Sequence, residues 1–381
     1  MKPSRRELLF GAAATGLAAT PLFAQTDRWF DPAKTPIGMP LTEAQQQAGL
    51  SFLERYPTID VHCHPGRFFL RDIEHPTAPM RSYGAPFEEK AIGDLRAGRV
   101  SGALFAGVAD AQLLDFAPDR GLFAAREFAP GEAWADYRRQ IDVLKALVAR
   151  GLVGRGRKAR DVEVAHRRRQ TACVFSVEGG DFIEDRLDRV HKAYADGVRS
   201  ITIVHYHINQ IGDIQTAPPH HGGLTRTGEA IVREMNKVGI IVDLAHAPMS
   251  VVKGAAAAST RPMMISHTNL STPALQHPRL VSTEQAKLVT DHGGIVGSVP
   301  SGIGQSSFAD WIDSILRLVD RLGVDHVAIG TDMDANFMPV FTTYRLWGLL
   351  PAALLARGMA EAEAAKVLGG NFLRVFEANR G

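Results

Sequence analysis

Short apolar runs alternate with helical patterns along most of this chain. Eight such runs follow one another, at residues 59–62, 100–108, 172–177, 200–204, 239–244, 263–266, 294–299 and 326–330. Amphipathic helical periodicity falls between them, as in residues 227–238 and residues 308–322. Short runs that are apolar on both faces are what a parallel sheet covered by helices requires.

This alternation predicts the fold class. Eight strands that alternate with helices in one chain indicate a (β/α)8 TIM barrel of the metal-dependent hydrolase type. A doubly wound open sheet is the alternative, but no Gly-rich phosphate loop follows the first strand. We place a single barrel domain at residues 58–381, after an N-terminal extension at residues 25–57 with a short helix at residues 42–56. The long segments at residues 67–99 and 109–170 are expected to place helices and loops over the barrel mouth.

Residues 1–24 have the features of a signal peptide. Arg5 and Arg6 precede an apolar, Ala/Gly-rich stretch that ends at Ala24. Paired arginines in this place resemble the twin-arginine export signal. We therefore expect the twin-arginine export machinery to be a partner in transit, and a periplasmic or secreted mature protein. An uncleaved membrane anchor is the alternative, because Leu22 is larger than the residue preferred at that place in a cleavage site.

Composition narrows the classes of function. The 381 residues are 45% hydrophobic and 22% charged, as in a globular protein with a large core. A formal net charge of +2 gives no indication of a nucleic-acid surface. The two cysteines, Cys63 and Cys173, are too few for a disulfide scaffold and fall in predicted strands, so we expect buried thiols, with a bridge between them as the alternative. The sequence is compatible with a homo-oligomer and does not fix the oligomeric state.

Polar residues of the kinds that bind metals end six of the eight predicted strands. They are His62 with His64, Glu178, His205, His246, His267 and Asp332. Side chains two apart on a strand point to one face, so both imidazoles of the first strand can aim into the barrel mouth. A core would favour apolar residues here, whereas the strand C-termini of this barrel are where catalytic groups converge.

Imidazole and carboxylate ligands suit Zn²⁺. One ion needs three protein ligands, so five candidates favour two ions per chain. The candidates are His62, His64, Glu178, His246 and His267, with Glu178 as the bridging carboxylate. Such a pair activates a shared water and polarises a scissile carbonyl. Asp332 would then act as the proton shuttle, and Asp334 is expected to cap the segment that follows.

These residues and their surroundings resemble the membrane (renal) dipeptidase family of metallopeptidases. The matching segments, in family order, are residues 177–180, 197–205, 228–246, 266–267, 277–279, 330–334 and 369–375. The resemblance extends over residues 58–381, and its central and C-terminal blocks are the most specific.

The resemblance implies a barrel with two zinc ions. The ligands it implies are His62 and Glu178 for one ion, and Glu178, His246 and His267 for the other. It also implies that His205 contacts the substrate carbonyl and stabilises the oxyanion. Arg279 would bind the substrate carboxylate, for which a guanidinium offers two parallel donors.

The chain departs from the family pattern in two places. The family usually has His-x-Asp on the first strand, whereas this chain has His62-x-His64, which changes the charge of the metal site. After the seventh strand the family usually has an aromatic substrate contact, but residues 297–302 read Gly-Ser-Val-Pro-Ser-Gly. The second departure raises the question of whether an ordinary dipeptide is the substrate.

Three functions fit these observations. The first is an exported zinc dipeptidase that cleaves small dipeptides with a free carboxylate, which the retention of Arg279 favours. The second is a dinuclear hydrolase of another small amide or ester, such as an N-acyl amino acid or a lactone, which the missing aromatic contact favours. The third is a catalytically silent metal- or ligand-binding protein, which has no need of a proton shuttle such as Asp332. Amidohydrolases that bridge their metals with a carboxylated lysine are disfavoured, because no lysine ends the fourth strand.

Overall fold

Eight parallel strands form a nearly closed barrel in this computed structural model, which describes residues 39–379. The predicted signal peptide lies outside the described residues. In sheet order the strands are β1 (Ile59–Cys63), β2 (Gly102–Val108), β6 (Ala172–Glu178), β7 (Val198–Thr202), β8 (Ile241–Asp243), β9 (Met264–Thr268), β10 (Ile295–Ser298) and β11 (Val327–Ile329). Each strand coincides with one predicted run or overlaps it. The predicted (β/α)8 TIM barrel is therefore confirmed.

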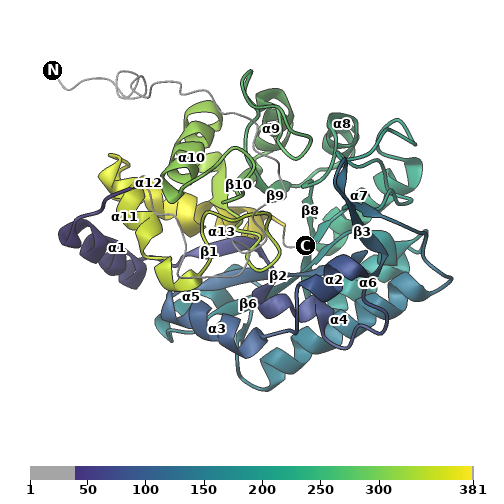
Figure 1. The fold of residues 1–381 in the computed structure, drawn as a ribbon, viewed down its shortest axis with the longest axis horizontal. Coiled ribbons are helices and arrows are strands. Elements are labelled where there is room, and N and C mark those ends of the chain that lie inside the picture. Colours follow the sequence, from purple (N-terminus) through teal and green to yellow (C-terminus); the bar gives the residue numbers. More distant parts are fainter. Residues whose placement is uncertain (1–38, 380–381) are drawn as a thin grey trace.

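Helices surround these strands (Figure 1). The three predicted at residues 42–56, 227–238 and 308–322 are α1 (Glu43–Arg55), α7 (Arg226–Val238) and α10 (Phe308–Leu322). The others are α2 (Ala78–Ser82), α3 (Glu88–Ala97), α4 (Glu132–Ala149), α5 (Ala159–Arg167), α6 (Asp188–Asp196), α8 (Met249–Ala258), α9 (Thr283–Thr290), α11 (Leu349–Ala356), α12 (Glu361–Ala365) and α13 (Asn371–Ala378). Side-chain caps define several helix starts: Thr42 and Gln45 form a capping box on α1, and Ser307 and Asp310 form one on α10. No helix in the described part of the chain is long and apolar enough to cross a bilayer.

The two long segments carry additional elements. Residues 67–99 hold α2 and α3, as expected, together with most of the 3-10 helix η3 (Pro65–Leu70). Residues 109–170 hold α4, α5, the short strand β5 (Gly154–Arg155) and an antiparallel hairpin of β3 (Leu114–Ala117) with β4 (Gly121–Ala124). The hairpin was not predicted. Helix α1, the first helix of the described chain, packs against α11 from the C-terminal part of the sequence (Figure 1).

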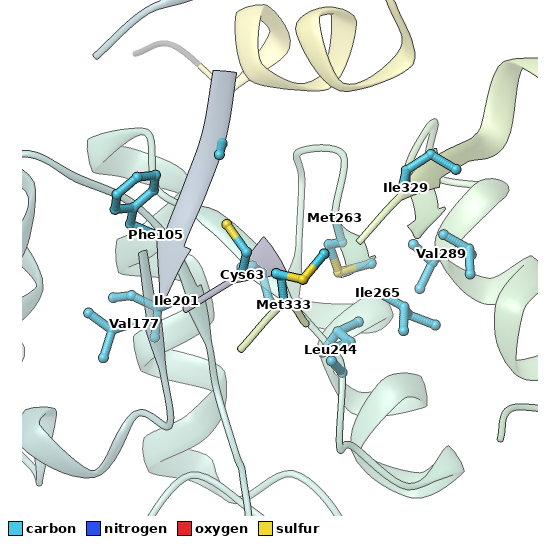
Figure 2. Packing of buried hydrophobic residues seen from close by; sticks show 14 of the residues in the cluster. Cys63, Phe105, Val177, Ile201, Leu244, Met263, Ile265, Val289, Ile329 and Met333 are labelled. Atoms are coloured by element: carbon cyan, nitrogen blue, oxygen red, sulfur yellow. The ribbon is translucent and has the colours of Figure 1, made fainter. Parts of the chain in front are cut away.

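The barrel interior is a compact apolar cluster. Seven strands contribute to it with Val61, Leu104, Val174, Ile241, Met264, Ile295 and Ala328 among others, and α13 adds Phe372 and Phe376. Residues from strands on opposite sides of a barrel can meet only in its interior, so α13 closes the end away from the mouth. Neighbouring strand residues such as Phe105, Val177 and Ile265 belong to the larger cluster that includes Val289 of α9 (Figure 2). Both cysteines are free and buried, as predicted.

The seam between β1 and β11 closes the barrel next to its mouth. The backbone N–H of Asp332 donates to the His62 carbonyl over 2.8 Å, and the N–H of His64 donates to the Met333 carbonyl over 2.9 Å. Below them lies the buried carboxylate of Asp60. It accepts hydrogen bonds from the His62 N–H, from both the N–H and the hydroxyl of Thr331, and from the Tyr344 hydroxyl. Asp60 thus joins both sides of the seam to the segment before α11.

We expect Tyr344→Phe to weaken this seam. The change removes the hydroxyl that donates to Asp60 over 2.7 Å and keeps the ring. Loss of a hydrogen bond to an ionised group costs ~1.5–3 kcal/mol. Burial raises the pKa of Asp60 to about 6, so urea unfolding at pH 8 tests the ionised form.

Tyr194→Phe on α6 is the matched control, since Tyr194 is exposed. Its free energy of unfolding should stay within about 0.5 kcal/mol of the unmodified protein. A Tyr344→Phe protein as stable as this control would show that the hydrogen bond contributes nothing.

Candidate metal centre

A buried carboxylate lies at the centre of the barrel mouth, surrounded by five imidazoles. Glu178 ends β6, and both of its oxygens face histidine Nε2 atoms. From Oε1 the distances are 3.0 Å to His246, 3.3 Å to His267 and 3.5 Å to His62. From Oε2 they are 3.5 Å to His64 and 3.5 Å to His205. The structure therefore brings together all the histidines that were singled out at the strand ends.

Backbone geometry turns two of the strand-end residues toward this centre. His246 has φ 65° and Asp332 has φ 54°, in the left-handed region that non-glycine residues seldom adopt. Each residue follows the end of its strand, β8 or β11, at the point where the chain leaves the barrel. Unfavourable backbone conformations of this kind are maintained by the surrounding structure and concentrate at functional sites.

The side chains form two groups with the geometry of metal ligands. His62, His64 and Glu178 make one group, and Glu178, His246 and His267 make the other, with the ligand atoms of each within 4.8 Å of one another. The Nε2 atoms of His62 and His64 are 3.2 Å apart, and those of His246 and His267 are 3.1 Å apart. Two ring nitrogens that face each other so closely can share only one proton. The donor set fits a cation in each group, and Glu178 belongs to both.

Protonation in one group agrees with this fit. Burial alone would raise the pKa of Glu178, but the surrounding imidazoles hold it well below its usual range, so the carboxylate is ionised. Burial, reinforced by nearby positive groups, holds the pKa values of His246 and His267 well below the usual range, so both rings are neutral. An ionised carboxylate and neutral imidazoles are the forms that bind metal ions.

His62 differs from these two rings. Burial lowers its pKa most, but the carboxylates of Glu178 and Asp332 together with that of Asp243 outweigh burial and raise the pKa to about 9. A proton therefore stays on His62 beside the two carboxylates, and a cation that binds there must displace it.

Outer hydrogen bonds fix the direction of the rings. His64 Nδ1 lies 2.7 Å from the Ala106 carbonyl, which can only accept, so Nδ1 carries the proton and Nε2 directs a lone pair at the centre. The Ser266 hydroxyl lies 2.9 Å from His267 Nδ1 and 3.3 Å from His62 Nδ1. His64 therefore points into the site rather than to the barrel rim.

Asp110 is a functional candidate that the sequence analysis missed. This fully buried residue follows β2, and its Oδ1 lies 2.6 Å from His205 Nδ1. Its Oδ2 accepts the backbone N–H groups of Tyr206 and His207 over 3.0 Å each. Burial lowers the pKa of His205, but Asp110 and Glu178 raise it overall. An acidic residue two positions after a predicted strand was the available signal.

Asp332 lies at the open side of the centre. Its Oδ1 is 3.1 Å from His64 Nε2 and 4.0 Å from His62 Nε2, and its side chain is 20% exposed, against 3% for Glu178. It can therefore reach both the centre and solvent.

The prediction that Asp334 caps the next segment is wrong, because its carboxylate accepts the Gly66 N–H and so links the loops after β11 and β1.

Arg279 lies at the rim, on the side of β8 and β9. Its Nη1 donates to the Gln215 side-chain oxygen over 2.7 Å, and the Gln215 N–H donates to the His246 carbonyl over 2.8 Å. Burial is the largest cause of the lowered pKa of His246, and the positive charge of Arg279 is the second largest. The guanidinium of Arg279 is thus close enough to the proposed ligands to influence their charge.

A sequence model of the membrane dipeptidase family, peptidase family M19, matches residues 47–380. The chain belongs to this family. Dipeptidase verJ from Clonostachys rogersoniana is 29% identical over 296 residues, which are 74% of each chain. The structure of the present chain superposes on that of the probable dipeptidase PvdM from Pseudomonas aeruginosa with a TM-score of 0.72 and 20% identity. The superposition covers 88% of this chain and 98% of the other.

A third relative is a metallopeptidase from Rhodobacter sphaeroides, whose structure contains a phosphinate mimic of the dipeptide L-Ala-D-Ala. It superposes with a TM-score of 0.71 and 21% identity, and covers 85% of this chain and 99% of the other. At these identities the two structures show the shared fold. The family match confirms the resemblance drawn from the motifs and makes this protein a metal-dependent dipeptidase by family.

For this family member we expect Glu178→Gln to release metal from both ligand groups together. A neutral amide keeps the size of the side chain and removes the only negative charge that the two groups share. Elemental analysis after growth in zinc-supplemented medium should find about two ions per unmodified chain and only traces in the variant. Near-full occupancy in the variant would contradict a shared ligand.

Proposed function

We propose that this protein is an exported zinc dipeptidase that uses two ions to hydrolyse small dipeptides. One observation carries the proposal: five histidine Nε2 atoms lie within 3.5 Å of the buried carboxylate of Glu178. His62, His64 and Glu178 would hold one ion, and Glu178, His246 and His267 the other. When bound, such a pair supplies an activated water and polarises the scissile carbonyl. The sequence of residues 1–24 supports export.

Asp332 would move the protons. Its carboxylate is within 3.1 Å of a proposed ligand, His64, and is partly open to solvent. It can take a proton from the attacking water and deliver it to the nitrogen of the leaving amine, which needs one when the peptide bond breaks.

His205 would stabilise the charge that develops on the carbonyl oxygen. Asp110 occupies its Nδ1, so a second proton on the ring sits on Nε2, which faces the centre. The raised pKa of His205 favours this doubly protonated form. A donor that is already oriented before the reaction is worth most at this position.

Arg279 would bind the carboxylate of the substrate. Gln215 occupies one nitrogen of the guanidinium and leaves the others for a ligand. This requirement favours dipeptides over substrates without a free carboxylate. The second candidate, hydrolysis of an N-acyl amino acid or a lactone, is favoured by residues 297–302, which place no aromatic ring after β10.

The proposal is tested by the substrates of the zinc-loaded protein. We expect hydrolysis of dipeptides and much slower turnover of N-acyl amino acids and lactones. Asp332→Asn should keep its metal and lower kcat by roughly two powers of ten or more, the scale of general acid–base catalysis. A near-normal kcat in this variant would remove Asp332 from the proton path, and faster turnover of N-acyl amino acids or lactones than of dipeptides would favour the second candidate.

Arg279→Ala should raise KM for dipeptides. Loss of a charge-assisted hydrogen bond costs ~1.5–3 kcal/mol, which corresponds to roughly a ten- to hundredfold change. The same substitution should reduce the affinity for a C-terminally amidated dipeptide, tested as substrate or as competing inhibitor, much less. Equal losses with both compounds would show that Arg279 is structural.

A further inference from the structure

An apolar wall borders the metal centre on the side of β1, β2 and β11. Its buried part consists of Phe69, Leu70, Met80, Val108, Ala111 and Leu114, with Ile73, Tyr83, Tyr206 and Ala335 half-buried against it. The wall reaches the proposed ligands, since the Phe69 ring stands edge-on to His64 with centroids 5.4 Å apart. It also reaches the proton shuttle, because the Ala335 N–H donates to the Asp332 carbonyl over 3.1 Å.

Tyr206 is the residue of this wall that comes closest to the reacting groups. It follows His205 directly, and its ring centroid lies 4.6 Å from that of His205 and 5.1 Å from that of His246. Both contacts are edge-on, at 67° and 75°. The Asp110 carboxylate accepts the Tyr206 backbone N–H over 3.0 Å and so fixes the start of the side chain. The side chain is therefore held in place while part of the residue remains exposed.

The hydroxyl of Tyr206 has no hydrogen-bond partner within residues 39–379. Two other tyrosines of this protein do have one, since Tyr344 donates to Asp60 and Tyr137 donates to Asp196. A tyrosine hydroxyl keeps its proton at neutral pH and can donate. A half-buried donor without a partner, next to a substrate site, is suited to a ligand.

A chain of contacts links Arg279 to Tyr206. Arg279 holds Gln215, Gln215 is bonded to the His246 backbone, and the His246 ring contacts Tyr206. The positive charge of Arg279 also acts on the phenol, since it lowers the pKa of Tyr206 against the effect of burial. An anion bound at the guanidinium would therefore lie near the phenol.

We propose that Tyr206 is a substrate-binding residue: its hydroxyl donates to the substrate carboxylate held by Arg279, and its ring packs against an apolar side chain of the dipeptide. The proposal rests on the proposed dipeptidase function and deepens it. It supplies an aromatic contact from the end of β7, whereas residues 297–302 after β10 have none. It also predicts a preference for dipeptides with apolar side chains.

Two variants separate the hydroxyl from the ring. Tyr206→Phe removes only the donor, so KM for a dipeptide with a free carboxylate should rise roughly tenfold, with kcat changed less than twofold. Its effect on the C-terminally amidated analogue, measured as KM or as an inhibition constant, should be less than twofold. Tyr206→Ala should also reduce the preference for apolar over glycine-containing dipeptides, whereas Tyr206→Phe should keep that preference. The exposed Tyr194→Phe serves as the control for loss of a hydroxyl.

Several results would overturn this role. An unchanged KM in Tyr206→Phe would exclude the hydroxyl contact, and equal losses with the free and the amidated compound would make the residue structural. A lower kcat at constant KM would mean that Tyr206 acts through His205 rather than on the carboxylate. These failures differ from failure of the proposed function, because a zinc-loaded wild type that hydrolyses no dipeptide would overturn both.

Discussion

The site depends on one ionised carboxylate kept out of water. An isolated buried charge of this kind is costly, and it is retained only where paired groups compensate. Glu178 meets that condition with five imidazoles: the end of β1 supplies two, and the ends of β7, β8 and β9, or the turns that follow them, supply one each. The strand ends can converge in this way because a barrel brings all its parallel strands to one mouth. A cation in each ligand group would complete the compensation.

The sequence predicted the barrel and most of the centre for a physical reason. A strand buried on both faces must be apolar, so a histidine or carboxylate at its end stands out, as Glu178 and His267 do. Other features depend on contacts that a linear pattern does not record. Asp110 lies beyond the end of its run, and its role becomes visible only beside His205. Asp334 was assigned to a local cap, but its partner Gly66 is far away in sequence. The β3–β4 hairpin was missed because each of its strands has only four residues, of which few are buried.

The histidine at position 64 is built into its surroundings. Its Nδ1 donates to the Ala106 carbonyl over 2.7 Å, which a carboxylate could not do, because both groups would be acceptors. The departure from the family's His-x-Asp pattern therefore involves β2 as well as the metal centre. It lowers the negative charge of the ligand set by one, so that the ring nitrogens of His62 and His64 face the carboxylates of Glu178 and Asp332.

The hydrogen bonds that close the barrel involve the same residues as the proposed chemistry. The backbone of Asp332 is bonded to that of His62, and the backbone of His64 to that of Met333. Separation of β1 from β11 would thus draw Asp332, the proposed proton shuttle, away from the proposed ligands His62 and His64. This seam joins the first strand of the barrel to the last, so the proposed centre is complete only after the C-terminal quarter of the chain has been synthesised and has packed against β1.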